Sequence, residues 1–92
     1  MTRQTVLELT VSNHPGVMSH ICGLFARRAY NVEGIACMPV NGGKRSKIWL
    51  LVNIEPRLDQ MVKQVVKLED VLVLERRDKG HAIFDTMNEF VQ

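Results

Sequence analysis

The sequence offers few residues whose types and spacing could perform catalysis. His14, His20 and His81 have no acid and nucleophile arranged near them in the sequence, and Cys22 and Cys37 are fifteen positions apart with no CxxC motif. No pair of histidines stands at zinc spacing. We therefore expect two buried, reduced thiols, no metal site and no catalytic residues in this chain.

The segment best suited to binding a ligand is residues 12–17, with the sequence SNHPGV. It is expected to start a helix, with Asn13 or His14 in the capping position. A helix start presents unpaired backbone N–H groups and a partial positive charge, and Gly16 would let an anion approach the backbone closely. An ordinary capped helix would use the same residues. Asn31, after this helix, is similarly typical of a C-terminal cap in the left-handed conformation.

Hydrophobic periodicity predicts the elements that position this segment. Strands are expected at residues 5–11, 32–40, 46–54 and 71–76, with an Asn-Gly-Gly turn between the middle two. One helix should follow residues 12–16 and run to about residue 29, and a second should begin after residues 55–57 and run to about residue 67.

This order predicts an α+β fold, the ferredoxin-like βαββαβ plait, with a four-stranded antiparallel sheet and two helices on one face. Residues 1–78 would form the domain. Residues 79–92 would form a partly ordered tail, with a helical stretch near residues 85–90.

The helices would leave the other face of the sheet uncovered. The apolar residues expected on that face are Val6, Ile35, Cys37, Trp49 and Leu51, with either Leu72 or Leu74. An exposed apolar patch usually marks a partner surface, so we expect an oligomer or a subunit that docks on a larger protein.

Composition excludes several classes of function. With 92 residues, 46% of them hydrophobic and 24% charged, the chain is an ordinary single globular domain. A net charge of +2, and Trp49 as the one aromatic residue on the central strands, exclude nucleic acid as a partner. The sequence has no membrane-spanning run and no secretion signal, which predicts a cytoplasmic protein. The loop at residues 12–16 lacks the arginine of an acylphosphatase-like enzyme and the paired cysteines of a soft-metal chaperone.

Two motifs and one strand carry a family resemblance. Residues 13–18 (NHPGVM), residues 22–34 (CGLFARRAYNVEG) and the later strand at residues 48–52 (IWLLV) resemble the ACT-domain signature of the acetohydroxyacid synthase (acetolactate synthase) small regulatory subunits. The resemblance covers residues 6 to about 77. Most members carry a second, carboxy-terminal domain, so this chain resembles most closely the short, single-domain isozyme I type.

The resemblance implies a non-catalytic regulatory chain in branched-chain amino acid biosynthesis, including that of isoleucine. Such a chain binds the large catalytic subunit, enhances its activity and confers allosteric feedback inhibition by valine. Thiamine diphosphate, a divalent metal and FAD would belong to the catalytic subunit, with no cofactor in this chain. The family also implies a homodimer, with the effector at the dimer seam.

Carried over by position, Asn13 and the backbone of Gly16 and Val17 would hold the effector carboxylate. Asn31 of the neighbouring protomer would fix its polar end, and apolar residues of the site would receive the branched side chain. The full expected effector site is Asn13, His14, Pro15, Gly16, Val17, Met18, Asn31 and Ile35. The uncovered sheet face around Trp49 and Leu51, or the tail, is expected to meet the catalytic subunit.

Two other functions stay open at this point. One is a stand-alone amino-acid-sensing ACT domain that regulates another enzyme or transcription, and the other is a small ferredoxin-fold enzyme. Co-purification of a large thiamine-dependent subunit would separate the first from the regulatory-subunit hypothesis, and a turnover assay would test the second. The choice among valine, leucine and isoleucine, the stoichiometry and the docking surface are open as well.

Overall fold

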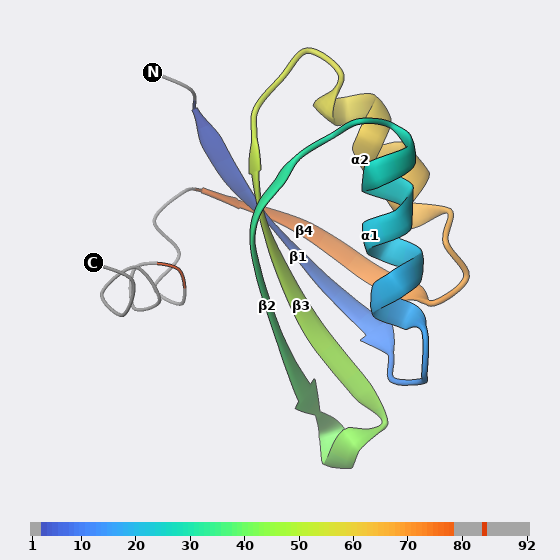
Figure 1. Cartoon of the computed structure of the whole chain (residues 1–92). Helices are drawn as coiled ribbons and strands as arrows, with labels where there is room; N and C mark the ends of the chain where they lie inside the picture. The colour runs from blue at the N-terminus through green and yellow to red at the C-terminus, as the bar shows by residue number, and fades with distance from the viewer. Residues whose placement is uncertain (1–2, 79–83, 85–92) are drawn as a thin grey trace.

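The computed structural model describes residues 3–78 and residue 84. Four strands form one antiparallel sheet in the order β2-β3-β1-β4, and two helices lie together on one of its faces (Figure 1). The elements are β1 (Gln4–Ser12), α1 (Val17–Arg27), β2 (Val32–Val40), the short 3-10 helix η1 (Asn41–Gly43), β3 (Arg45–Asn53), α2 (Leu58–Val66) and β4 (Val71–Asp78). The predicted ferredoxin-like βαββαβ plait is confirmed.

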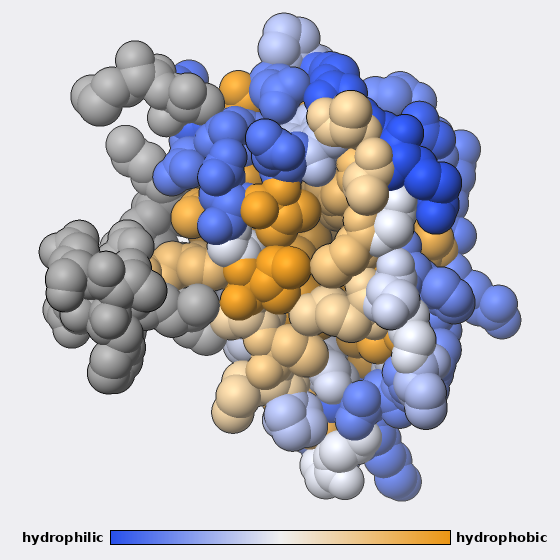
Figure 2. Space-filling view, in the orientation of Figure 1, coloured by the Kyte–Doolittle hydropathy of each residue, from blue (hydrophilic) through white to orange (hydrophobic). Residues whose placement is uncertain are grey.

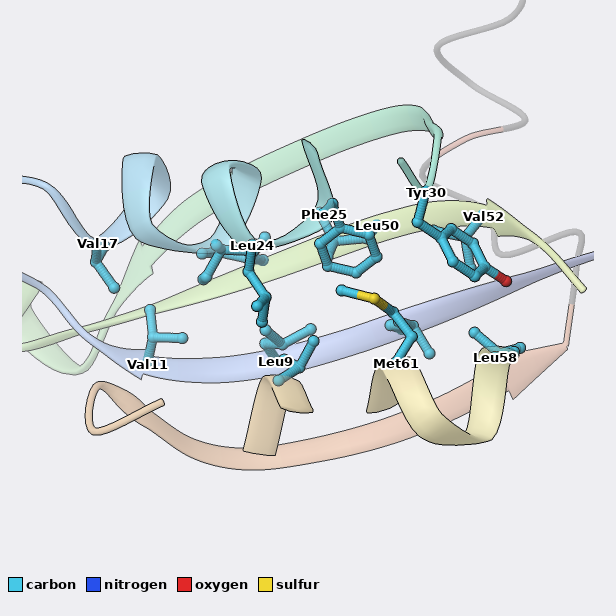
Figure 3. Packing of buried hydrophobic residues seen from close by; sticks show 14 residues of the cluster. Leu9, Val11, Val17, Leu24, Phe25, Tyr30, Leu50, Val52, Leu58 and Met61 are labelled. Carbon is cyan, nitrogen blue, oxygen red and sulfur yellow. The ribbon is translucent and has the colours of Figure 1, made fainter. Parts of the chain in front are cut away.

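The core lies between the helices and the sheet, because both helices place apolar residues three or four positions apart toward it. Figure 3 shows side chains of both helices meeting those of β1 and β3. The helix residues buried there are Val17, Ile21, Leu24 and Phe25 of α1 and Leu58, Met61 and Val65 of α2. The strand residues are Leu7, Leu9 and Val11 of β1 and Ile48, Leu50 and Val52 of β3.

The opposite side of the sheet, which neither α1 nor α2 covers, is the open face. Val6 lies there opposite Leu51, and Glu8 lies opposite Trp49, since both alternate with the core residues of β1 and β3. The predicted placement of Val6, Trp49 and Leu51 on this face is therefore confirmed.

Two residues of β2 were expected on the open face and lie on the helix face instead. Ile35 pairs with Leu50 and Cys37 pairs with Ile48, both of which belong to the core side of β3. The register shifts between Val32 and Gly34, and a one-residue bulge moves every later side chain to the other face. Strict alternation from residue 32 therefore gives the wrong face.

A second bulge does the same in β4. Val71 pairs with Val11 and Val73 pairs with Thr10, so Leu72 is the extra residue between them. Leu74 then pairs with Leu9 and packs against the core, and Val73 takes the open-face position. The bulge therefore excludes Leu74 from the open face, whereas Leu72 is exposed at the bulge itself.

The remaining expectations on composition have mixed outcomes. Both cysteines are free, as predicted, but Cys22 is half-buried and Cys37 is exposed, so they are not two buried thiols. Neither described helix is long and apolar enough to cross a membrane. The predicted tail, with its helical stretch near residues 85–90, lies outside the described residues apart from Phe84.

Candidate functional site

The loop between β1 and α1 leads into a helix start that no side chain among the described residues caps. Gly16 occupies the capping position with φ of 90°, a left-handed conformation that favours glycine, and its carbonyl accepts the N–H of His20 at 3.0 Å. The prediction of Asn13 or His14 as the cap was therefore wrong. The loop is exposed and none of its side chains bonds to the first N–H groups of α1. The positive end of the helix is therefore accessible to an anion.

Asn13 fastens the loop to the connection between β2 and β3. Its side-chain Nδ2 donates to the carbonyl of Gly43 at 2.7 Å, and its backbone N–H donates to the carbonyl of Lys44 at 3.2 Å. An asparagine amide carries two N–H donors, so Nδ2 can hold Gly43 and still offer a hydrogen to a ligand.

His14 fastens the same loop to the turn before β4. Its Nε2 lies 2.5 Å from Oδ1 of Asp70, and its Nδ1 lies 2.8 Å from the carbonyl of Pro15. The hydrogen bond with Asp70, followed by that with Pro15, raises the pKa of His14, and the His14 contact lowers the pKa of Asp70. His20 of α1 is exposed and also approaches Asp70, with Nδ1 3.5 Å from Oδ2.

Asp70 was not among the predicted site residues, since it is remote from the loop along the chain. Its backbone carbonyl also accepts the N–H of Ser12 at 3.0 Å, so Asp70 holds the chain at Ser12 as well as at His14. Only the pairing of β1 with β4 brings these segments together, and this pairing is not between sequence neighbours. Within residues 3–78 and 84, no three His, Cys, Asp or Glu side chains gather in a way that could hold a metal ion.

The apolar residues expected at the site differ in what they can offer a ligand. The side chain of Val17 is buried in the core, and its backbone N–H donates to the His14 carbonyl at 3.3 Å. Met18 and Ile35 are half-buried and pack against the same core cluster from α1 and β2. Pro15 is exposed. The structure thus leaves Met18 and Ile35, rather than Val17, to present apolar surface.

Asn31 lies beyond the other end of α1. The left-handed residue that ends the helix is Ala29, with φ of 51°, so the prediction of Asn31 as the left-handed cap was wrong. The N–H of Tyr30 donates to the Phe25 carbonyl at 2.9 Å, which closes the helix end and leaves Asn31 exposed. The eleven residues of α1 span about 16 Å. Asn13 and Asn31 of one chain therefore cannot contact the same small amino acid.

A hollow of about 120 Å³ lies at this far end of α1, lined by Arg28, Tyr30, Arg57, Gln60 and Met61. The guanidinium of Arg57 donates to the carbonyls of Arg28 and Ala29 at 2.7 and 2.9 Å and lies 5.0 Å from the centre of the Tyr30 ring. The Tyr30 hydroxyl donates to the Asn53 carbonyl at 2.5 Å. Through these hydrogen bonds Arg57 and Tyr30 join the end of α1 to the start of α2 and the end of β3.

The open face carries a buried carboxylate. Glu8 is 7% exposed and accepts hydrogen bonds from Nζ of Lys47 at 2.8 Å and from Nε1 of Trp49 at 3.0 Å, with Arg77 at 3.5 Å. The Lys47 hydrogen bond lowers the pKa of Glu8 to about 2, against the opposing effect of burial and with help from Trp49 and Arg77. Trp49, predicted to meet a partner, is thus held in place by its indole N–H.

Phe84 covers one end of the open face. It is 7% exposed, and a Cβ placed on Gly34 would lie 3.0 Å from its ring and 3.5 Å from Cβ of Leu51. The absence of a side chain at Gly34 therefore makes room for the Phe84 ring. Leu51, the other predicted partner residue, is half-buried beside this contact.

Comparison with known proteins identifies the family to which this chain is similar. Residues 7–73 match the family described as the AHAS small subunit-like ACT domain. The acetolactate synthase isozyme 1 small subunit of Escherichia coli (strain K12) is 55% identical over 87 residues, which cover 95% of this chain and 91% of that protein. The acetolactate synthase small subunit of Mycobacterium bovis is 32% identical over 78 residues, or 84% of this chain and 46% of that protein.

Solved structures agree with the sequence comparison. The acetolactate synthase small subunit from Thermotoga maritima superimposes with a TM-score of 0.72 at 29% identity, over 80% of this chain and 47% of that one. The ACT domain of GTP pyrophosphokinase from Chlorobium tepidum superimposes with a TM-score of 0.68 at 14% identity, over 83% of this chain and 99% of that one, and shows the fold alone. The chain belongs to the family of acetolactate synthase small subunits that fold as an ACT domain.

Proposed function

We propose that this chain is the regulatory subunit of an acetolactate synthase, and that it binds the large catalytic subunit, enhances its activity and makes that activity sensitive to valine. The observation that carries the effector-binding part is the helix start at Gly16, which no described side chain caps and beside which Asn13 has a second amide hydrogen. Catalysis, with thiamine diphosphate, a divalent metal and FAD, would belong to the large subunit.

The α1 start suits the carboxylate of an amino acid. Backbone N–H groups in the first turn and the helix dipole both favour a negative charge, and glycine at residue 16 lets the carboxylate approach the backbone. Asn13 would donate its remaining amide hydrogen to the same carboxylate. Met18 and Ile35 would receive the branched aliphatic side chain, which is the part of valine that gains from burial.

The site needs a second copy of the chain, because Asn13 and Asn31 lie at opposite ends of α1. A two-fold dimer brings Asn31 of one protomer to the Asn13 loop of its partner and creates two equivalent sites. The β2 edge of the sheet fits this role. Residues 34–40 carry no charge, Met38 is 56% exposed, and Figure 2 shows apolar surface gathered over β2.

The open face would meet the catalytic subunit. Trp49 and Leu51 are half-buried there, and the hydrogen bond to Glu8 fixes the indole in one orientation before any partner arrives. A preorganised aromatic side chain loses little conformational freedom on binding, which favours its use as an interface anchor.

The central test adds this chain to the purified catalytic subunit and measures acetolactate formation with and without valine. We expect higher activity with the chain present and inhibition by valine only then. A chain that binds valine but neither associates with the catalytic subunit nor changes its rate would instead be a stand-alone amino-acid sensor.

A complementation experiment tests the shared site. Gly16→Asp places a negative charge against the effector carboxylate, and Asn31→Ala removes the contact from the partner, so each variant alone should lose valine binding in calorimetry. A refolded equimolar mixture should recover about a quarter of the sites, because half of the dimers are mixed and each mixed dimer keeps one intact site. Asp59→Asn, an exposed change on α2, is the control. No recovery in the mixture would place both residues in one protomer's site or in none.

A further inference from the structure

The contacts of His14 determine its protonation state. Both ring nitrogens face oxygen acceptors, since Nε2 lies 2.5 Å from the Asp70 carboxylate and Nδ1 lies 2.8 Å from the Pro15 carbonyl. A neutral imidazole has one N–H donor, so it satisfies one of these acceptors and turns a lone pair toward the other. The imidazolium ion donates to both. The observed arrangement therefore selects the charged form of His14.

The surroundings of His14 act in the same direction. Asp70 makes the direct contact from the turn before β4, and Glu69 adds a further negative charge from the same turn. From α1, His20 shares the Asp70 carboxylate at 3.5 Å. From the connection between β2 and β3, Lys44 meets the loop through its backbone carbonyl, which holds Asn13. Two carboxylates thus face one loop histidine that stands two residues before Gly16.

We propose that Asp70 is a positioning residue for the effector site, because it holds His14 as an imidazolium beside the start of α1 and so couples valine binding to the protonation of His14. This inference rests on the proposed function. Asp70 does not touch the effector in this scheme. It fixes the loop that carries Asn13 and adds, through His14, a positive charge to the partial charge of the helix start.

The sign of the pH dependence follows from the direction of the shift. Asp70 raises the pKa of His14 above 6.5, so the imidazolium is fully formed below that pH and is lost as the pH rises through the raised value. The effector carboxylate stays charged throughout this range. Valine affinity should therefore be highest near pH 6 and fall as His14 loses its proton. The exposed position of His14 limits the expected fall to about threefold to tenfold.

The test is calorimetry of the full chain with valine from about pH 6 to about pH 8.5, beside the variants His14→Gln and Asp70→Asn. His14→Gln can donate a hydrogen bond but cannot titrate, so its affinity should be independent of pH in this range. Asp70→Asn keeps the shape but not the charge, so the midpoint of the fall should move to lower pH. Asp59→Asn removes an exposed carboxylate on α2 and should leave the profile unchanged.

A direct titration of His14 by NMR separates the proposed role of Asp70 from a merely structural one. If Asp70 only held the loop in shape, its replacement would not move the titration midpoint of His14. The midpoint for the His14 ring protons should fall in Asp70→Asn and stay in place in Asp59→Asn. An unmoved midpoint, or a His14→Gln variant that keeps the wild-type pH profile, would overturn the role of Asp70. Wild-type valine binding that does not vary with pH would overturn this inference alone, whereas no valine binding at any pH would overturn the proposed effector site with it.

Discussion

The two faces of the sheet are built by different chemistry. On the helix face, Leu7, Leu9 and Leu50 are fully buried among aliphatic and aromatic side chains. On the open face, a carboxylate at Glu8 is buried nearly as well, but it is held by Lys47 and charged or polar neighbours. Burial alone therefore does not tell the aliphatic face from the face that carries a buried charge. The two faces differ in their charged groups: among the described residues, the helix face excludes them from its core, and the open face buries a carboxylate that is paired with Lys47 and Trp49.

The difference has a physical consequence for each face. An aliphatic face gains stability from every contact and tolerates no gap, because removed volume leaves a cavity. A paired charge gains little net stability, but it holds its partners in fixed positions and makes removal of one partner costly. The helix face should therefore determine how stable the domain is, and the open face should determine which orientation Trp49 presents.

The largest expected effect is on the helix face. Leu50→Ala should lower the free energy of unfolding by about 2–5 kcal/mol, because Leu50 is fully buried between both helices and the sheet. Urea denaturation monitored by circular dichroism measures this loss. A loss below about 1 kcal/mol would contradict the assignment of this face as the main source of stability.

The next effect concerns Glu8. Glu8→Gln removes the charge that Lys47 and Trp49 contact, and should cost about 1–2 kcal/mol at neutral pH. In the wild type, a pKa lowered to about 2 means that this contribution is complete above about 4.5 and is lost as the pH falls toward 2. Denaturation at several acidic pH values should show a shallower loss in Glu8→Gln. Asp59→Asn, at an exposed position on α2, is the control, and equal acid sensitivity in both variants would argue against the buried carboxylate.

A smaller effect is expected where Phe84 meets Gly34. Gly34→Ala should cost about 1 kcal/mol or less, since the new Cβ would lie 3.0 Å from the Phe84 ring and the ring must shift. In a Phe84→Ala background the same change should be neutral or stabilising, because alanine loses less backbone entropy than glycine in a strand. A double-mutant cycle measures the difference. Equal effects in both backgrounds would show that Phe84 does not rest on Gly34.

The smallest effect is expected at Val73, which is 48% exposed on the open-face side of β4. Val73→Thr keeps the branched shape and should change the free energy of unfolding by less than about 0.5 kcal/mol. Thermal denaturation suffices to measure it. A larger loss would mean that Val73 is buried in solution and that more of the open face is covered than its exposure indicates.

The elements could be predicted from the sequence because their patterns are local. Residues 32–40 form a strand with the predicted bounds, and the Asn41-Gly42-Gly43 turn joins β2 to β3 as expected. The faces of β1 and β3 were also predicted correctly, since both strands alternate without interruption. Local periodicity is sufficient wherever the backbone keeps a regular pleat.

The errors have one shared cause in the strands and another at the site. Bulges at residues 33 and 72 shift the alternation in β2 and β4, which a count of every second residue cannot detect. Asp70 was missed because its partner His14 is 56 positions away and meets it only through the tertiary fold. Asn13 and His14 could be located in advance as parts of a helix start, but the direction of each side chain depends on contacts with Gly43 and Asp70.

The two edges of the sheet differ in charge, and this difference limits how many copies of the chain can pair edge to edge. The second half of the β4 edge carries the charged residues Glu75, Arg76 and Arg77, which discourage another strand from adding there, whereas residues 34–40 of the β2 edge are uncharged. If two copies pair through β2, each uses its one receptive edge, and both outer edges of the doubled sheet are charged. Such pairing is self-limiting, so the chain can expose an apolar edge strand without forming open-ended fibres.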